Sequence, residues 1–83
     1  MTILERTREK IKHLYETNPH VHVNVSISHP KIELKNDPAV IKGVYPHVFR
    51  IEETSNGVPQ YHTLQYTDVL TGQIEIAELN EQE

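Results

Sequence analysis

Histidine is the residue type in this 83-residue chain that most readily suggests chemistry, because six imidazole rings are available to bind zinc or copper. His20 and His22 are two residues apart, which on a β-strand places both rings on one face. His29, His47 and His62 would add ligands only if the fold gathered them. No acidic or thiolate ligand stands at a matching local spacing, so we predict no metal site. Mild acidification would charge these rings, but that follows from composition alone.

Catalytic groups are not arranged for a reaction in this sequence. There is no cysteine, no glycine-flanked serine and no glycine-rich phosphate loop. Glu52 and Glu53 are adjacent, so on a strand they point to opposite faces and cannot share a substrate as acid and base. Asp68 stands in a run typical of a tight turn, where aspartate caps its own backbone. We therefore predict a protein that is not an enzyme, with no catalytic residue and no cofactor.

Aromatic and basic residues on predicted strands make nucleic-acid binding an alternative function. Tyr61 and Tyr66 could stack on bases, with Arg50 and Lys31 as cations. Tyrosines on short strands more often pack in the core or at its rim, however. The net charge is −4, and residues 1–50 hold all eight basic side chains, whereas residues 51–83 hold seven acidic ones and no lysine or arginine. Nucleic-acid affinity depends on a basic surplus, so this function is the second choice.

A helix at about residues 3–16 is the first element that the sequence predicts. Thr2 and Glu5 have the spacing of a capping box, and Asn18-Pro19 should end the helix. An apolar stripe with basic borders could lie on a membrane surface or dock a partner. Without Phe or Trp it is a weak anchor, so we expect it to pack on its own domain. The stripe consists of Ile3, Leu4, Thr7, Ile11, Leu14 and Tyr15.

Five or six short strands should follow the helix. Strict alternation of apolar and polar residues covers 21–28, and shorter runs cover 32–34, 40–44, 48–53, 60–66 and 74–77. Turn signals separate them at Asn36-Asp37-Pro38, Asn56-Gly57 and residues 67–72. So small a sheet exposes both edges unless it closes. We therefore predict a mainly β fold, a small barrel plugged at one end by the helix.

The length and composition of the chain bound its organisation. At 9.6 kDa it is one domain over residues 1–83, with the helix at about 3–16, the barrel at about 20–78 and a frayed acidic tail at about 79–83. The absence of cysteine fits a reducing compartment, and no apolar run reaches the roughly 20 residues of a membrane span. We expect a cytoplasmic protein. A thin core and exposed strand edges favour self-association into a homodimer.

Two runs of this sequence resemble the Veg family of small proteins from low-GC Gram-positive bacteria. The first, at residues 43–51, contains Tyr45-Pro46 and Phe49; the second, at residues 65–71, contains Tyr66 and Asp68 followed by Val-Leu-Thr. The likeness is strongest over residues 43–72 and extends from about residue 9 to 79. It implies a small SH3-like barrel, of the kind that includes Sm-like barrels, and brings no catalytic or ligand residues.

The same resemblance implies a function. Veg proteins are described as stimulating biofilm formation by opposing a transcriptional repressor of matrix genes. We therefore expect a regulatory protein whose partner is another protein, a transcriptional regulator, and whose interaction surface the sequence does not locate. The Tyr45-Pro46 and Asp68 runs are interpreted as fold residues first, since they read as a strand entry and a tight turn.

Overall fold

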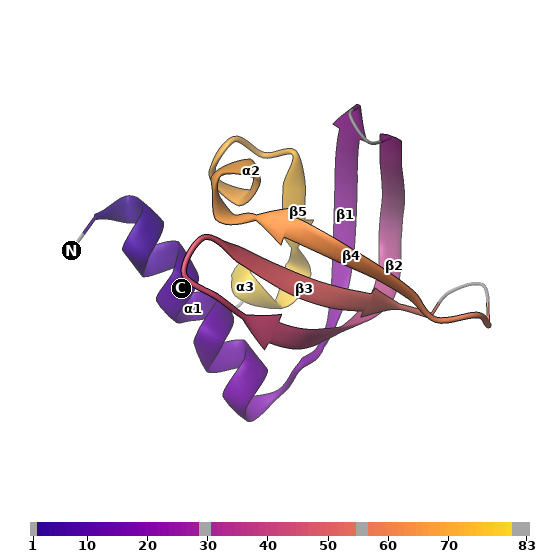
Figure 1. Ribbon diagram of the computed structural model, residues 1–83, viewed down its shortest axis with the longest axis horizontal. Coiled ribbons are helices and arrows are strands. Elements are labelled where there is room, and N and C mark those ends of the chain that lie inside the picture. Colours follow the sequence, from indigo (N-terminus) through magenta and orange to yellow (C-terminus); the bar gives the residue numbers. More distant parts are fainter. Residues whose placement is uncertain (1, 29–30, 55–56, 81–83) are drawn as a thin grey trace.

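The computed structural model describes residues 2–28, 31–54 and 57–80, which form five strands and three helices (Figure 1). His29, a candidate ligand, and Asn56, part of a predicted turn, lie outside the described residues. In chain order the elements are α1 (Ile3–Thr17), β1 (His20–Ser28), β2 (Lys31–Val44), β3 (Val48–Glu53), β4 (Gln60–Gln65), α2 (Tyr66–Leu70), β5 (Ile74–Ile76) and α3 (Ala77–Asn80).

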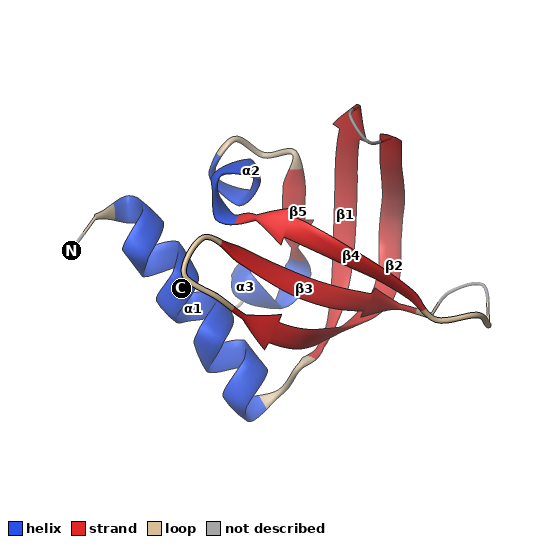
Figure 2. Cartoon of the chain, viewed as in Figure 1, coloured by secondary structure: helices blue, strands red, loops and turns tan. Residues whose placement is uncertain are grey.

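The five strands form one antiparallel sheet in the order β4-β3-β2-β1-β5. Figure 2 shows the helices gathered at one end of this sheet, and Figure 1 shows β3 and β4 running across the direction of β1 and β2. The predicted mainly β fold with an N-terminal helix is confirmed. Among the described residues β4 and β5 are edge strands that do not pair with each other, so the sheet is open and the predicted barrel is not confirmed.

The N-terminal helix begins and ends where local chemistry dictates. The backbone N–H of Glu5 donates to the Thr2 hydroxyl at 3.1 Å, and the backbone N–H of Thr2 donates to the Glu5 carboxylate at 3.4 Å. This is the capping box that the sequence predicts. The helix ends at Thr17, because Asn18 precedes a proline and leaves the helical region of backbone conformation.

One stripe of this helix is buried against its own domain, as predicted. Ile11 and Leu14 are buried in the core, and α1 lies against β2 and α2. Ile3 and Tyr15, at the ends of the predicted stripe, are exposed. The contact therefore runs from Leu4, which is half-buried against the core, to Leu14.

The strand β2 is longer than the sequence suggests. Asn36-Asp37-Pro38, predicted as a turn, lies inside this single strand of 14 residues. Val23 pairs with Asp37 and Val25 with Leu34, so β2 carries one residue more than β1 between the two pairs. Such a β-bulge absorbs the extra residue and bends the strand without ending it.

Asn36 sits at the centre of this bulge. Its φ of 50° is in the left-handed region, which asparagine tolerates better than most residues. Its backbone N–H donates to the side-chain oxygen of Asn24 on β1 at 2.9 Å, so the extra residue stays hydrogen-bonded. The residue types of Asn36-Asp37-Pro38, which are typical of a turn, are here found at a β-bulge inside a strand.

The end of the chain is more helical than predicted. The expected strand 60–66 stops at Gln65, and the expected turn 67–72 is largely replaced by α2, which begins at Tyr66. The closing strand covers only Ile74–Ile76, since Ala77 already belongs to α3. Residues 79 and 80, the first two of the predicted tail, belong to α3.

The core consists of aliphatic side chains and two aromatic ones, which stack on each other. Phe49 on β3 and Tyr66 on α2 are buried, with ring centroids 5.4 Å apart and planes inclined by 24°. Val, Ile, Leu and Ala from the helix and the strands complete the cluster. No described helix combines the length and the apolar character that crossing a bilayer requires.

Candidate recognition face

The histidines are spread over different elements. His20 and His22 both lie exposed on β1, His47 lies in the β2–β3 loop, and His62 lies half-buried on β4. Within the part of the chain that the structure describes, no three His, Cys, Asp or Glu side chains gather as a metal site would require. His22 has a different role, because its imidazole contacts the carboxylate of Glu78 on α3.

The contact between β1 and α3 is bidentate. The backbone N–H of His22 donates to Glu78 Oε1 at 2.8 Å, and the imidazole Nδ1 lies 2.9 Å from Oε2. Burial opposes ionisation of Glu78, but the hydrogen bonds from the His22 ring and backbone outweigh it and hold the pKa of this carboxyl below its ordinary value of 4.5. The contact fastens the short C-terminal helix to the sheet.

This contact predicts a dependence of stability on pH. A carboxyl whose pKa is lowered by folding stabilises the fold above its unfolded pKa, and loses that contribution as the pH falls through its folded pKa. The melting temperature should therefore fall more steeply between about pH 5 and pH 3 in the wild type than in Glu78→Gln. Thermal melts followed by circular dichroism measure it, with Glu75→Gln on β5 as the control. Equal slopes for wild type and Glu78→Gln would contradict the prediction.

The acidic residues weighed as catalysts lie apart. Glu52 and Glu53 point to opposite faces of β3, as expected: Glu53 is buried, while the carboxylate of Glu52 lies 3.6 Å from the amine of Lys42. Asp68 lies in the first turn of α2, half-buried. These positions do not bring two carboxyls to one point.

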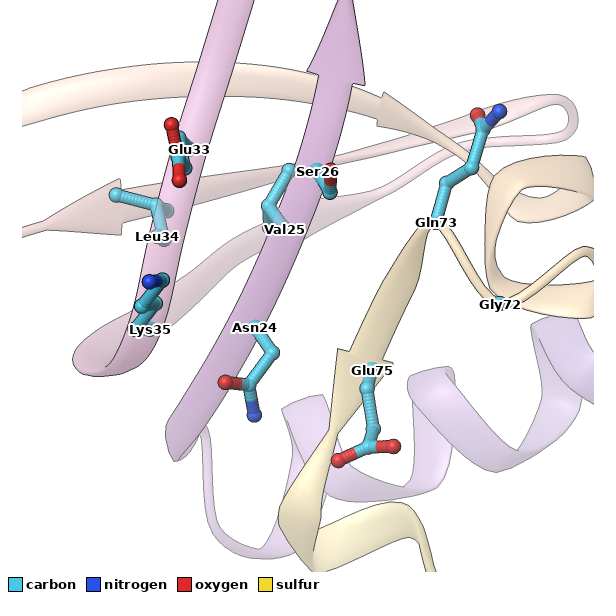
Figure 3. Close-up of a pocket in the computed structure, with 9 residues that line it drawn as sticks. All are labelled: Asn24, Val25, Ser26, Glu33, Leu34, Lys35, Gly72, Gln73 and Glu75. Atoms are coloured by element: carbon cyan, nitrogen blue, oxygen red, sulfur yellow. The ribbon is translucent and has the colours of Figure 1, made fainter.

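A polar groove of about 350 Å³ crosses β2, β1 and the start of β5 (Figure 3). Glu33 and Lys35 line it from β2, Asn24 from β1, and Glu75 from β5. Figure 3 shows the two carboxylates on opposite sides of the groove, without a common point to which the side chains converge. The groove therefore offers mixed surface charge and no organised set of reacting groups.

Exposed aromatic and cationic side chains follow one another on the other part of the outer sheet face. Gly43 on β2 pairs with Arg50 on β3, which pairs with Thr63 on β4. Directly paired residues share a face of a sheet, so these three positions form one row. The ring of Tyr45 covers Gly43, and the guanidinium carbon of Arg50 lies 5.5 Å from the ring centroid of Tyr61.

We call Tyr45, Arg50 and Tyr61 the aromatic strip. Tyr45 is 46% exposed and Tyr61 is 56% exposed, which leaves both rings available to a partner. Arg50 lies over the Tyr61 ring at a cation–π distance, so its position is fixed by a contact inside the strip. Tyrosine and arginine are the residues that most often dominate binding energy at protein interfaces.

The core holds the Tyr45 end of the strip in place. The Tyr66 hydroxyl donates to the backbone carbonyl of Tyr45 at 2.6 Å, and a guanidinium N–H of Arg8 donates to the carbonyl of Pro46 at 3.4 Å. Burial raises the pKa of Tyr66, so its hydroxyl remains a donor across the physiological range. The corner formed by Tyr45 and Pro46 is therefore fixed before any partner binds.

A notch of about 270 Å³ lies between this corner and α1. Arg8 and Lys12 line it from the helix, one turn apart. Val44, Tyr45 and Pro46 form the opposite wall, and Glu9 also contributes to the lining. The notch thus joins two cations to an aromatic and apolar surface.

The sequence predicted part of this face. Tyr61 and Arg50 are in contact and exposed, as a stacking surface requires. Tyr66 is buried in the core, in line with the packing role preferred for these tyrosines, so it is not available as a stacking residue. Lys31 stands at the far end of β2. Tyr45 is interpreted from the sequence as a fold residue first, although a tyrosine that lies between a glycine and a proline at the end of a strand is a signal that could have pointed to this face.

The described residues thus combine a small mainly β fold with an exposed strip of aromatic and cationic side chains. The chain belongs to the Veg family: the family model described as "Biofilm formation stimulator VEG" matches residues 3–77. The resemblance predicted from the two motifs is thereby confirmed, and the family description supports a regulatory role. Comparison with curated proteins and with solved structures gave no match.

Proposed function

We propose that this protein regulates biofilm genes without chemistry of its own, by binding a cytoplasmic transcriptional regulator through the aromatic strip. The family assignment supports the regulatory role, and the strip carries the proposal for its mechanism. Tyr45, Arg50 and Tyr61 are exposed, yet the Tyr45 ring already lies on Gly43 and the Arg50 guanidinium already lies over the Tyr61 ring. Binding would therefore order few side chains. Preorganised aromatic and arginine side chains are the typical anchors of tight interfaces.

We also infer that the curved sheet is a variant of the small-barrel architecture. The order β4-β3-β2-β1-β5 places the last strand beside the first, as a closing barrel needs. Two irregularities in the register of β2, opposite β1 and opposite β3, support curvature, because bulges bend strands. Curvature turns the outer face of β2, β3 and β4 into a convex surface on which the aromatic strip is accessible.

A double substitution tests the proposed interface. Tyr45→Ala with Tyr61→Ala should weaken binding of the regulator about 30-fold or more, since one interface hot spot contributes about 2 kcal/mol. Tagged wild-type and variant chains are used to capture the regulator of the matrix genes from a lysate of the parent bacterium. The affinity of each chain for the captured regulator is then measured by calorimetric titration. Tyr15→Ala removes another exposed tyrosine, on α1, and is the matched control.

Two results would overturn the proposal. Either the wild-type chain retains no transcriptional regulator, or the double variant binds it as well as the Tyr15→Ala control. Recovery of RNA or DNA in place of a protein, with an affinity that falls steeply with salt, would assign the strip to nucleic acid instead. Circular dichroism of the double variant should match the wild type, because both side chains are exposed.

A further inference from the structure

We propose that the notch between α1 and the Tyr45-Pro46 corner binds a carboxylate of an acidic segment in the protein partner. This rests on the proposed function and adds the chemistry of the partner. Arg8 and Lys12 supply the charge, and the corner supplies the apolar wall along which the stem of a glutamate or aspartate would lie. The notch, of about 270 Å³, has room for one such side chain.

Arg8 has donors to spare for this role. A guanidinium carries five N–H groups in a fixed fork, and the hydrogen bond from Arg8 to the Pro46 carbonyl uses one of them at 3.4 Å. That bond orients the side chain, and the remaining N–H groups can hold a carboxylate in the bidentate geometry that arginine favours. Within the described residues, neither Arg8 nor Lys12 forms an ion pair with a carboxylate.

The charge of the surroundings favours a short acidic segment over a long polyanion. Glu9 leaves the notch a net charge of +1, and Lys42 on β2 already lies 3.6 Å from the carboxylate of Glu52. The whole chain carries −4. Nucleic acid gains affinity from many neutralised phosphates, whereas a carboxylate needs only the matched donors of one pocket.

The position of the notch also suits an extended partner. It shares Tyr45 with the aromatic strip, so a segment with its carboxylate in the notch can continue across the Tyr45 ring, which covers Gly43, towards Arg50 and Tyr61. Arg50 would meet a second acidic side chain on this path. Because Tyr66 and Arg8 fix the corner, this surface needs little rearrangement on binding.

An NMR titration tests the inference with a defined probe. Capped hexaglutamate is added to the ¹⁵N-labelled full chain, with capped hexaglutamine as the uncharged control. We expect saturable shifts of the backbone amides of Arg8, Lys12, Val44 and Tyr45, at low salt, with hexaglutamate only. Arg8→Gln should weaken this binding about tenfold, the effect of losing one charge-assisted hydrogen bond, and Lys12→Gln should act in the same direction. Lys31→Gln, at the far end of β2, should leave it unchanged.

Several results of the NMR titration and of the pull-down would contradict the inference. Shifts scattered over all lysines, identical shifts with hexaglutamine, or equal effects of Lys31→Gln and Arg8→Gln would overturn the inference. The regulator pull-down separates it from the proposed function. If Tyr45→Ala with Tyr61→Ala abolishes binding while Arg8→Gln with Lys12→Gln does not, the strip is the interface and the acidic-segment inference fails. If neither pair of substitutions matters, the proposed function fails as well.

Discussion

Gly43→Ala should abolish most partner binding while leaving the fold intact. A Cβ at position 43 would lie 2.6 Å from the Tyr45 hydroxyl oxygen and 2.8 and 2.9 Å from two ring carbons, closer than such atoms can approach. The ring is the end of an exposed side chain, so it can swing away at little cost to stability. Tyr45 would then leave both the strip and the notch, and we expect affinity for the regulator to fall by about 30-fold or more.

Calorimetric titration of the regulator with wild-type and Gly43→Ala protein measures this loss. The informative control is a double-mutant cycle: once Tyr45→Ala has removed the ring, Gly43→Ala should have no further effect on affinity. Additive losses in the cycle, or unchanged affinity of the single variant, would show that Gly43 does not act through Tyr45. Thermal melts should differ little between wild type and Gly43→Ala, since the backbone at this position requires no positive φ.

Phe49→Ala should have the largest effect on stability. Phe49 is fully buried and stacked on Tyr66, and removal of a buried phenylalanine side chain typically costs about 3–5 kcal/mol. Domains are stable by only about 5–15 kcal/mol, and a chain of this length lies towards the lower end. Much of the variant should therefore be unfolded at 37 °C. Because Tyr66 holds the Tyr45 carbonyl, any folded fraction should also bind the regulator less well.

Urea denaturation followed by circular dichroism measures the loss, as a lower midpoint at unchanged slope. Phe49→Leu keeps most of the apolar volume and should cost clearly less than Phe49→Ala. A loss below about 1 kcal/mol for Phe49→Ala would mean that the Phe49–Tyr66 stack is not the centre of the core.

Local signals in the sequence located most elements of this fold. The capping box of Thr2 and Glu5 and the break at Asn18-Pro19 bounded α1, because both act within a few residues. Strict alternation identified β1 for the same reason. Closure of the sheet and the helical character of residues 66–70 depend on distant packing, with Tyr66 drawn into the core against Phe49, and no local pattern reports that.

The strand β2 was predicted as two separate strands, at 32–34 and 40–44, because its alternation changes phase. Its inner residues fall at even positions before Asn36 and at odd positions from Asp37 to Ile41, and the second irregularity, between Ile41 and Gly43, returns them to an even position at Val44. The bulge at Asn36 causes this change, and a single alternation pattern therefore cannot span the strand. Pro38 is tolerated because β3 pairs with β2 only from Ala39 onwards, so at Pro38 the strand is locally an edge.

The candidate recognition face could likewise be predicted only in part from the sequence. Arg50 and Tyr61 belong to neighbouring strands of one hairpin, and residue type alone was enough to suggest them. The partnership of Arg8 with Pro46 spans 38 residues of sequence, so the notch could be recognised only once α1 was placed against the β2–β3 corner. Tyr66 packs in the core, as preferred from its residue type, but it does so from the first turn of α2 and not from the end of a strand.

The left-handed backbone of Asn36 has a consequence for redesign of this protein. The side chain lies in solvent, and by exposure alone the position would count as freely replaceable. A β-branched residue there would not tolerate the positive φ of the β-bulge, and the pairing of β1 with β2 depends on that bulge. Engineers seeking inert attachment points for labels or linkers should therefore pass over this asparagine and choose exposed positions of ordinary backbone geometry, such as Glu16 on the outer side of α1.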